Sequence, residues 1–492
     1  MQESQNRFEP RGPHRAGGSR LEARSGRAKR LLPTLLLVAL TAGCTSYHPE
    51  PLSPADRAAA IGARTLDNPR LLKFISLEHA SPPTGRRWDL ADLTLAALYY
   101  HPDLDIARAK LVEARAGVTT AGQVPNPSLS FEDLAYNATA GTWTVAPVIN
   151  FLIETFGKRE YRTKEARALV DAARSDLATA SWQVRGGVRN ALLNSWAAQR
   201  RLALLRQRLD LQDQLVTLLE HRFAAGQASA LDVARERTNR NQITLALRDA
   251  ERQGVDARTQ LAAAIGIPLQ ALDGVDITFG VFERPEQPIP DTGALRREAL
   301  VARSDVQALL AQYAAAESAV ALQVANQYPN ITLSPGYGYD AGQNVYRLLP
   351  AADLPVFNQN QGPIAQARAR REMAAARFTA LQTQIIDAID GAVASYRAAT
   401  QALATADVLA TGEEQRARRT LRSFQAGEVD RPTLLTVQIE SAVAEQSRFD
   451  AMVQQRQALG AVEDALQHPL YEPGATFSVP QTNPRLPAEP SS

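Results

Sequence analysis

Two long stretches without proline dominate the pattern of hydrophobic and polar positions. Residues 158–223 and 364–424 contain no proline, so each is predicted to form one helix of about 60 residues, on the order of 90–100 Å long. In the first stretch, apolar side chains and one polar member recur at alternating intervals of three and four residues; they are Leu202, Leu205, Leu209, Gln212, Val216, Leu219 and Phe223. This spacing predicts left-handed supercoiling against a partner helix.

Shorter helices are predicted on either side of these stretches. Residues 230–265 and 433–466 follow Gly226 and Gly427, where each long helix is expected to reverse. Residues 93–121 and 295–327 are expected to be the opening helices of two similar halves. His101-Pro102 interrupts the first of them, because proline cannot continue a helix.

Four segments of about nine to twelve residues alternate between apolar and polar side chains, with aromatic residues near their ends. The faces predicted to be apolar are Trp143, Val145, Pro147, Ile149, Phe151 and Ile153; then Ile331, Leu333, Pro335, Tyr337 and Tyr339; then Tyr346, Leu348, Leu354 and Val356. A less regular alternation begins at residues 128–136. The pattern is typical of transmembrane barrel strands, although a soluble hairpin with one buried face is the better explanation of any single segment.

The chain contains two copies of one module. Matching anchors recur at almost constant offsets: Phe156 and Phe357 at 201, Phe223 and Phe424 at 201, Pro125-Asn126 and Pro329-Asn330 at 204, and Asp103 and Asp305 at 202. Each copy reads helix, strand, strand, long helix, long helix. The strand-to-helix corners are placed at Phe156 and Gly157 and at Phe357 and Asn358.

These features divide the chain into six predicted parts. They are a signal peptide (1–43), a Pro-rich, irregular N-terminal leader (44–90), the first repeat (91–268), a connector (269–292), the second repeat (293–467) and a disordered tail (468–492).

The single cysteine, Cys44, excludes an intramolecular disulfide. It follows a basic region and a thirteen-residue apolar stretch, residues 31–43, which has the length of a signal sequence. Leu40-Thr41-Ala42-Gly43-Cys44 resembles a bacterial lipoprotein signal, so we expect lipidation at Cys44. A plain secretory signal with an incidental cysteine is the alternative. Beyond Cys44 no apolar run approaches eighteen residues, so no transmembrane helix is predicted.

Charge and composition argue against several functions. The formal net charge is +2, but residues 1–43 hold eight basic and three acidic residues, so the remainder sums to −3. A nucleic-acid partner is therefore not expected. The six histidines lack metal-ligand spacing, and no nucleophile elbow or phosphate loop is present. We predict no enzymatic activity, no catalytic residue, no cofactor and no metal site.

Four predicted membrane strands cannot close a barrel by themselves, and an open edge in lipid leaves backbone groups unpaired. Two chains would give about eight strands and a filled interior, whereas three would give about twelve and room for a channel. The residues predicted to face inward are mainly Gly, Ser, Thr, Asn, Asp and Arg, which favour a water-filled interior over a packed core. The sequence therefore predicts a mainly α homotrimer with a small β part.

The residues that carry the duplication also carry a resemblance. The Phe-x-x-Gly reversals, Ala263-Ala264-Ile265-Gly266-Ile267-Pro268 and Phe156-Gly157-Lys158-Arg159 resemble the TolC-like outer-membrane efflux proteins. The segments 336–340 and 354–362 are most similar to the CzcC-like branch, which serves heavy-metal efflux pumps of the resistance–nodulation–division (RND) type.

That resemblance implies a bacterial outer-membrane protein that extends into the periplasm. It implies a trimer with a twelve-stranded β-barrel in the lipid and an α-barrel tunnel of twelve helices. A periplasmic adaptor (membrane fusion protein) and an RND-type inner-membrane pump would dock at the helix reversals, and the pump would supply the energy. The alternative function is a periplasmic coiled-coil scaffold without a pore, anchored by a lipid on Cys44.

We expect the pump-side entrance and gate at the two helix reversals. The residues assigned to this tip are Phe223, Gly226, Asp232, Phe424, Gly427, Glu428, Asp430 and Arg431. In the family, aspartates just after the second reversal ring the constriction, but threonines occupy those places here. Glu428 and Asp430 are the nearest substitutes and Asp232 is the acid of the first half, so rings of carboxylates are predicted to favour cations. Pairing of Arg431 with one acid would cancel part of this effect, and ordinary solvated turn charges or adaptor contacts are the alternative.

Overall fold

The structure is a computed structural model that describes residues 47–78, 87–139, 141–284, 288–340, 343–470, 481 and 483–485. The predicted signal peptide and Cys44 lie outside these residues, as does most of the predicted tail. Residues up to Ala60 form one compact unit and residues from Ile61 onward form a second. The second unit contains the sheet and the long helices.

The leader is not irregular, contrary to the prediction, because it contains α2 (Pro54–Gly62) and α3 (Pro69–Glu78). Pro69 stands at the first helical position, where its missing N–H costs nothing. The side chain of Asn68 accepts a hydrogen bond from the Arg70 backbone N–H at 2.9 Å. Leu71 and Ile75 of α3 are fully buried, so an apolar face of this short helix packs into the protein core.

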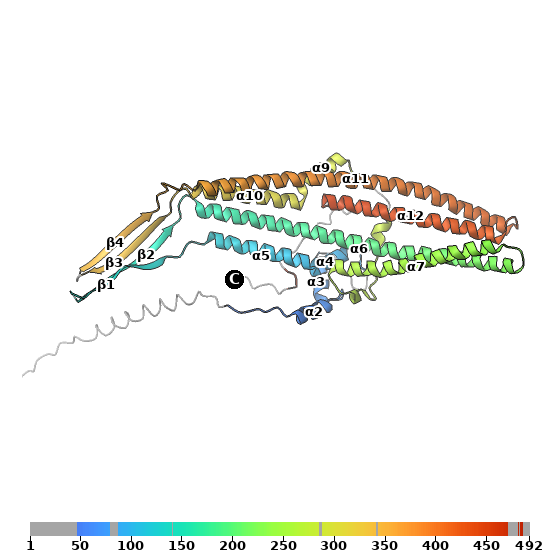
Figure 1. The fold of residues 1–492 in the computed structure, drawn as a ribbon, viewed down its shortest axis with the longest axis horizontal. Helices are drawn as coiled ribbons and strands as arrows, with labels where there is room; N and C mark the ends of the chain where they lie inside the picture. The colour runs from blue at the N-terminus through green and yellow to red at the C-terminus, as the bar shows by residue number, and fades with distance from the viewer. Residues whose placement is uncertain are drawn as a thin grey trace, which may run out of the picture. The chain divides into compact units, whose positions relative to one another are not determined.

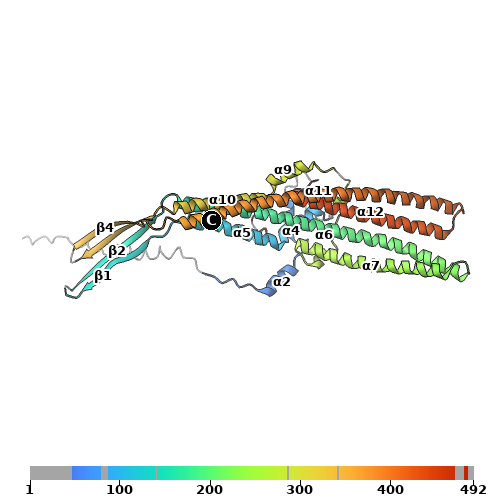
Figure 2. The same ribbon diagram turned by 45° about the horizontal axis from the view of Figure 1, so that its top comes forward.

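Two long helices run through the second unit, as predicted. They are α6 (Lys158–Ala224), with 67 residues, and α11 (Gln361–Gln425), with 65 residues. Their antiparallel partners are α7 (Ala230–Ile265) and α12 (Arg431–Leu466). The sheet lies at one end of α6 and α11, and both helix reversals lie at the other end (Figure 1, Figure 2).

The opening helix of each copy is split in two. His101 ends α4 (Leu90–Tyr100) and caps α5 (Pro102–Gly122), as the His101-Pro102 pair predicts. Arg303 separates α9 (Thr292–Ala302) from α10 (Ser304–Ala325) in the same way. Between the copies, the connector contains η1 (Leu269–Leu272) and α8 (Gly280–Glu283).

Helix α10 has an unusual composition. Among the described helices it is the one long and apolar enough to cross a membrane by length and composition. However, α10 packs along α6 and α11, so part of its apolar surface is covered by neighbouring helices. We therefore read it as a bundle helix.

The sheet has four antiparallel strands in the order β1-β2-β3-β4, and β1 and β4 are its edges. The strands are β1 (Ser128–Asn137), β2 (Thr142–Ile153), β3 (Ile331–Asp340) and β4 (Gln343–Ala352). The β2–β3 pair joins the two copies, with Val145 opposite Tyr339, Val148 opposite Gly336 and Phe151 opposite Leu333.

The two hairpins have equivalent registers. Leu129 lies opposite Ile149 in the first hairpin, and Leu333 lies opposite Pro350 in the second. These pairs are related by offsets of 204 and 201 residues, the offsets of the sequence anchors. The internal duplication therefore extends to the pairing of individual residues.

One irregularity distinguishes the first hairpin. The register of β1 shifts between Phe131 and Asp133, which leaves Glu132 as an extra residue in a β-bulge. The shift changes the phase of the alternation, so that Leu134 and Tyr136 stay on the same face as Phe131. This bulge explains why β1 alternates less regularly in the sequence than β2 does.

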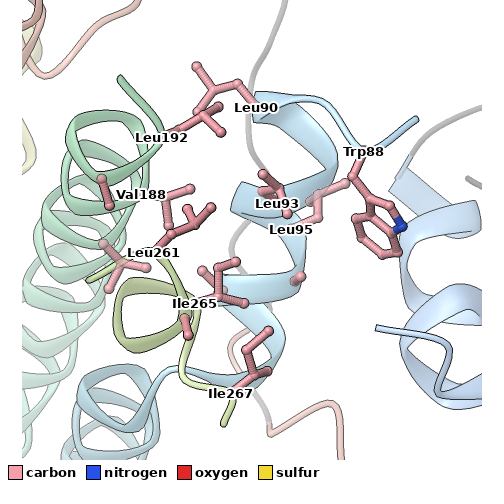
Figure 3. Packing of buried hydrophobic residues seen from close by; sticks show 14 of the residues in the cluster. Trp88, Leu90, Leu93, Leu95, Val188, Leu192, Leu261, Ile265 and Ile267 are labelled. Atoms are coloured by element: carbon pink, nitrogen blue, oxygen red, sulfur yellow. The ribbon is translucent and has the colours of Figure 1, made fainter. Parts of the chain in front are cut away.

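The main hydrophobic core lies beside the middle of α6, where α4 packs against α6 and the end of α7 (Figure 3). Leu93, Val188 and Ile265 are fully buried there. Gly266 ends α7 with φ of +86°, and a Cβ on it would lie 3.1 Å from the Tyr100 carbonyl oxygen. Glycine is required for both reasons.

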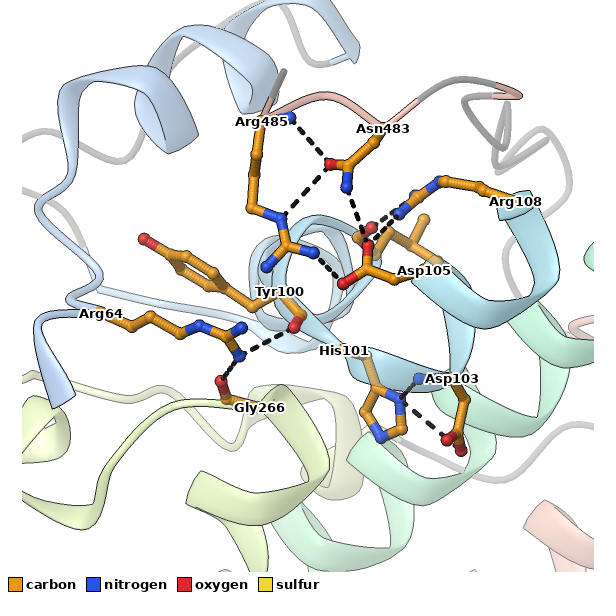
Figure 4. Close-up of polar contacts among 10 residues, drawn as sticks. Arg64, Tyr100, His101, Asp103, Asp105, Arg108, Gly266, Asn483 and Arg485 are labelled. Carbon is orange, nitrogen blue, oxygen red and sulfur yellow. Dashed lines mark hydrogen bonds and ion pairs between the residues drawn. The ribbon is translucent and has the colours of Figure 1, made fainter. Parts of the chain in front are cut away.

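Polar contacts fasten the ends of the second unit to this core (Figure 4). Arg64 Nη1 donates to the carbonyl oxygens of Tyr100 and Gly266 at 3.0 and 2.6 Å. Near the C-terminus, Arg485 forms an ion pair with Asp105, which also accepts a hydrogen bond from Asn483 at 3.3 Å. These contacts hold the break between α4 and α5 in place.

Candidate functional site

One face of the sheet is apolar and exposed. Paired residues on neighbouring strands share a face, so the register defines its members: Leu129, Phe131, Leu134 and Tyr136; Trp143, Val145, Pro147, Ile149, Phe151 and Ile153; Ile331, Leu333, Pro335, Tyr337 and Tyr339; and Tyr346, Leu348 and Pro350. The predicted members on β2 and β3 are confirmed, as are Tyr346 and Leu348. Leu354 and Val356 lie beyond the end of β4.

The opposite face is polar and contains a hydrogen-bonded ladder. Asn150 Nδ2 donates to Ser130 Oγ at 3.0 Å, and Asn150 Oδ1 accepts from Ser334 Oγ at 2.7 Å. Gly336 and Gly338 lie on this face of β3. The hydroxyl, amide and glycine positions of this face agree with the prediction, whereas Ala146 and Val148 of β2 lie on the same face and, like Ser334, are buried in the single chain.

An ion pair spans the polar face. Arg347 of β4 lies 3.4 Å (Nη1 to Oε2) from Glu132, the extra residue of the β1 bulge. A Cβ on Gly338 would lie 3.8 Å from Arg347 Nη2, so glycine leaves room for the long side chain beside β3. Asp133 lies opposite Ala146 on the same face. The face therefore holds two acids and one arginine in this region.

The first strand-to-helix corner is built around Phe156 and Gly157. Both residues have positive φ, 55° and 71°, and Gly157 is the left-handed N-cap of α6. The Phe156 ring stacks on Tyr328, with centroids 4.0 Å apart and planes inclined at 18°. This corner lies at the position predicted from the sequence.

The second corner differs from the prediction. Its left-handed residue is Asn360, the N-cap of α11, with φ of 60°. Asn358 instead accepts a hydrogen bond from the Asn360 backbone N–H at 2.9 Å, and the Phe357 side chain is 98% exposed. The link from strand to helix comprises residues 353–360 here and residues 154–157 at the first corner, so it is four residues longer and the turn lies further along the chain.

Lys158 is a functional candidate that the sequence reasoning missed. It is buried at the first corner, where its Nζ donates to the Tyr328 carbonyl oxygen at 2.6 Å and to Asn330 Oδ1 at 2.7 Å. Burial lowers the pKa of the Lys158 ammonium group below its usual value. Lys158 therefore ties the start of α6 to the segment that enters β3. The position of this lysine directly after Phe156-Gly157 is the only feature of the sequence that could have indicated its role.

The two helix reversals have the same backbone design. Gly226 and Gly427 have φ of 74° and 78°. Their N–H groups donate to the carbonyl oxygens of Phe223 and Phe424 at 2.9 and 3.0 Å. These left-handed glycines satisfy carbonyl groups at the ends of the helices. Phe223 is half exposed and Phe424 is partly buried.

The acids at the tip lie at or near the first residues of α7 and α12. Asp232 lies in the first turn of α7, where its backbone N–H donates to Ser229 Oγ at 3.1 Å. Asp430 is the N-cap of α12 and accepts from the Thr433 N–H at 3.1 Å. Glu428 is exposed in the second reversal. The structure thus places all three acids at the end of the protein farthest from the sheet.

Two side-chain hydrogen bonds join the helix pair α6 and α7 to the helix pair α11 and α12 at this tip. Arg222 Nη1 donates to Asp430 Oδ2 at 2.9 Å, and Arg431 Nη2 donates to Gln214 Oε1 at 3.3 Å. Asp430 is thus paired with Arg222 rather than with Arg431, the arginine considered in the sequence. Hydrogen bonds from Thr433, and then the bond from Arg222, hold the pKa of Asp430 below its usual value.

Within the described part of the chain, no group of three His, Cys, Asp or Glu residues is arranged to hold a metal ion. The candidate site therefore consists of the apolar and polar faces of the sheet and the charged helix reversals. These are surfaces for contact or for the passage of a solute.

Comparison with known proteins supports this interpretation. Residues 94–267 match the family model "Outer membrane efflux protein". The chain is 27% identical to the pyoverdine export outer membrane protein OpmQ of Pseudomonas aeruginosa, over 86% of this chain and 93% of that protein. It is 26% identical to the cobalt-zinc-cadmium resistance protein CzcC of Cupriavidus metallidurans, over 68% of this chain and 79% of that protein.

The fold agrees with solved structures. The outer membrane protein VceC of Vibrio cholerae superimposes with a TM-score of 0.62 at 20% identity, over 77% of this chain and 96% of that chain. The chain is thus similar to outer membrane efflux proteins in sequence, through the family match and the two relatives aligned over most of their lengths, and it shares the fold of VceC.

Proposed function

We propose that the protein is a passive outer-membrane channel of a tripartite efflux system, built from three copies of the chain. The single observation that carries this proposal is the sheet, which is apolar on one face, polar on the other and, in the described part of the chain, unpaired at both edges. Such a sheet can span lipid only when its edge strands are paired, because unpaired backbone N–H and C=O groups are costly in hydrocarbon. Four strands from each of three copies would give a barrel of about twelve strands with a water-filled interior.

The helix reversals are the proposed docking end. Because they lie at the opposite end of α6 and α11 from the sheet, they would extend into the periplasm when the sheet is in the outer membrane. A periplasmic adaptor and an RND-type inner-membrane pump would meet the channel there. The proposed channel performs no chemistry, so the pump supplies the energy.

The cargo is proposed to be heavy-metal cations, on the resemblance of residues 354–362 and 336–340 to the CzcC-like branch. The relative named for pyoverdine export supports an organic cargo instead. Deleting the gene should lower growth in cobalt, zinc or cadmium if metal cations are carried. Unchanged metal tolerance, together with retention of an organic product in the cells, would assign the channel to the organic cargo.

A membrane wash distinguishes the channel from a lipid-anchored scaffold without a pore. A closed barrel should remain in outer-membrane fractions after carbonate or urea washing and leave only with detergent. The same behaviour is expected of Cys44→Ser, because the barrel rather than the lipid would hold the protein. Release of Cys44→Ser by carbonate would support the scaffold.

We further propose that Cys44 is acylated in the mature protein, on the basis of the apolar stretch and the Gly43-Cys44 pair. An intact-mass spectrum of the native protein should show the mass of the acyl groups, and Cys44→Ser should lack it. A native chain without this added mass would refute lipidation and leave the channel proposal unaffected.

A further inference from the structure

The free edges of the sheet are complementary parts of one repeated pattern. β4 ends the second hairpin and β1 begins the first, and among the described residues neither has a strand paired to its outer side. Within the chain, the β2–β3 pair already joins the end of one hairpin to the beginning of the next. If three copies close a barrel, as proposed above, β4 of one copy must pair with β1 of the next copy in the equivalent way.

The register of that junction follows from the duplication. The offset of 201 residues carries Val145, Val148 and Phe151 of β2 onto Tyr346, Leu349 and Ala352 of β4. On the other side, Tyr339 and Gly336 of β3 correspond to Tyr136 and Asp133 of β1 at an offset of 203, and Leu333 corresponds to Leu129 at 204. The bulge at Glu132 accounts for the difference of one residue.

We propose that three contacts define the junction between copies: Tyr346 lies opposite Tyr136 of the next copy, Leu349 opposite its Asp133 and Ala352 opposite its Leu129. This inference rests on the proposed function and adds to it the residues through which the copies recognise one another.

The faces of the strands agree with this register. Tyr346, Tyr136, Ala352 and Leu129 all belong to the apolar face, and Leu349 and Asp133 both belong to the polar face. A slip of one residue would turn the apolar side chains of one strand to the polar face. Slips of two keep the faces, but they break the repeat observed between β2 and β3.

The junction would also complete a row of aromatic rings. Tyr136 already packs on Trp143 with ring centroids 5.2 Å apart, and Tyr337 packs on Tyr346 at 5.7 Å. Tyr346 is 82% exposed and Tyr136 is 54% exposed in the single chain. Placing them opposite one another links the two pairs around the outside of the barrel, where aromatic girdles stabilise membrane strands.

The corner below the strands offers a second complementary pair. Inside the chain, Phe156 stacks on Tyr328, which precedes β3. The same offsets relate Phe156 to Phe357, and Tyr328 to Val124, which precedes β1. Phe357 is 98% exposed and Val124 is 59% exposed, so both present a free apolar surface at the edges of the sheet, while the different turn at Asn360 means that the partner copy sets the contact of Phe357.

Disulfide trapping tests the register directly. The double variant Tyr346→Cys/Tyr136→Cys, oxidised in outer membranes and run on a non-reducing denaturing gel, should give covalent dimers and trimers. Ala352→Cys/Leu129→Cys should do the same, and it provides a second pair if the tyrosine substitutions impair assembly. The matched control is Val145→Cys/Tyr339→Cys, the equivalent pair within one chain, which should crosslink without increasing the mass.

A slipped pair tests the alternative register. Tyr346→Cys/Leu134→Cys moves the partner by two residues and should give little covalent oligomer. If this pair crosslinks and the proposed pairs do not, or if none crosslinks although the detergent-extracted particle contains three copies, the register is wrong and the channel proposal stands. A particle of one copy would overturn both.

Discussion

At the scale of single residues, the polar face of the sheet carries two acids and one base. Arg347 faces Glu132, and Asp133 lies beside this pair. In a barrel of three copies these side chains would form rings around the lumen, and rings of charge select ions in pores. The alternation in the sequence predicts that Arg347 faces inward. The bulge that brings Glu132 toward it depends on pairing between strands, which the sequence does not reveal.

Removing the arginine should make the channel more selective for cations. Arg347→Gln leaves two acids per copy unbalanced, so the reversal potential in planar bilayers under a salt gradient should move toward that of the cation. Glu132→Gln should move it the opposite way, and the double variant should return close to the native value. Identical reversal potentials for all four proteins would show that these side chains do not face the ion pathway.

The acids of the tip should act unequally. Glu428 is exposed, whereas Asp430 is engaged by Thr433 and Arg222. We expect Glu428→Gln to reduce cation selectivity more than Asp430→Asn, and the double variant to bring the reversal potential nearest the unselective value. Asparagine keeps an oxygen that can cap α12. No shift in any variant would leave these acids as ordinary surface charges.

The pairing at Asp430 also sets a pH dependence. Because its pKa is lowered in the folded protein, its charge stabilises the fold above the ordinary pKa of about 3.9. That stabilisation is lost as the pH falls through the lowered value. The difference in thermal midpoint between the native protein and Asp430→Asn should thus stay constant from about pH 8 to 5 and shrink below about pH 4. A difference that changes near neutral pH would contradict this assignment.

At the scale of elements, the seam between α6 and α12 depends on glycines opposite large charged side chains. Gly460 of α12 faces the Arg189 guanidinium so closely that a Cβ would overlap it. Arg189 is buried, donates to the Arg456 carbonyl oxygen at 2.9 Å and lies 3.5 Å from Glu463. It therefore has little freedom to move aside.

A pair of glycine substitutions tests this seam. Gly460→Ala should destabilise the helices by roughly 1–3 kcal/mol, because overpacking outweighs the better helix propensity of alanine. Gly412, in the interior of α11, has open space around its Cβ position, so Gly412→Ala should raise stability by up to about 1 kcal/mol. Thermal unfolding of the helical signal in detergent measures both. Stabilisation by Gly460→Ala would mean that Arg189 moves freely.

The elements also show where sequence reasoning succeeds. Long runs with helical periodicity and four alternating segments are local patterns, and they predicted α6, α7, α11, α12 and the apolar face of the sheet. The leader helix α3 was missed because its Pro-rich surroundings masked a short apolar face. The pairing of Arg222 with Asp430 was missed because the two residues are 208 positions apart. Only the packing of α6 beside the start of α12 brings them together.

At the scale of the whole molecule, the duplication supplies both the fold and the reason for assembly. Within one chain, the β2–β3 pair joins the two β-hairpins. The edge strands β1 and β4 could each take part in a further pair of this kind with another copy. Closing these edges with further copies satisfies every backbone group in lipid. The sequence predicted the repeat from a few anchors, but the residue pairing across the junction required the registers of β2 with β3 and of both hairpins.

The mass of the detergent-extracted particle tests the central claim most directly. Native mass spectrometry, or light scattering corrected for bound detergent, should give three copies of the chain in a particle that retains its strand signal. One or two copies with the full strand signal would contradict a barrel closed by three chains, and with it the proposed channel.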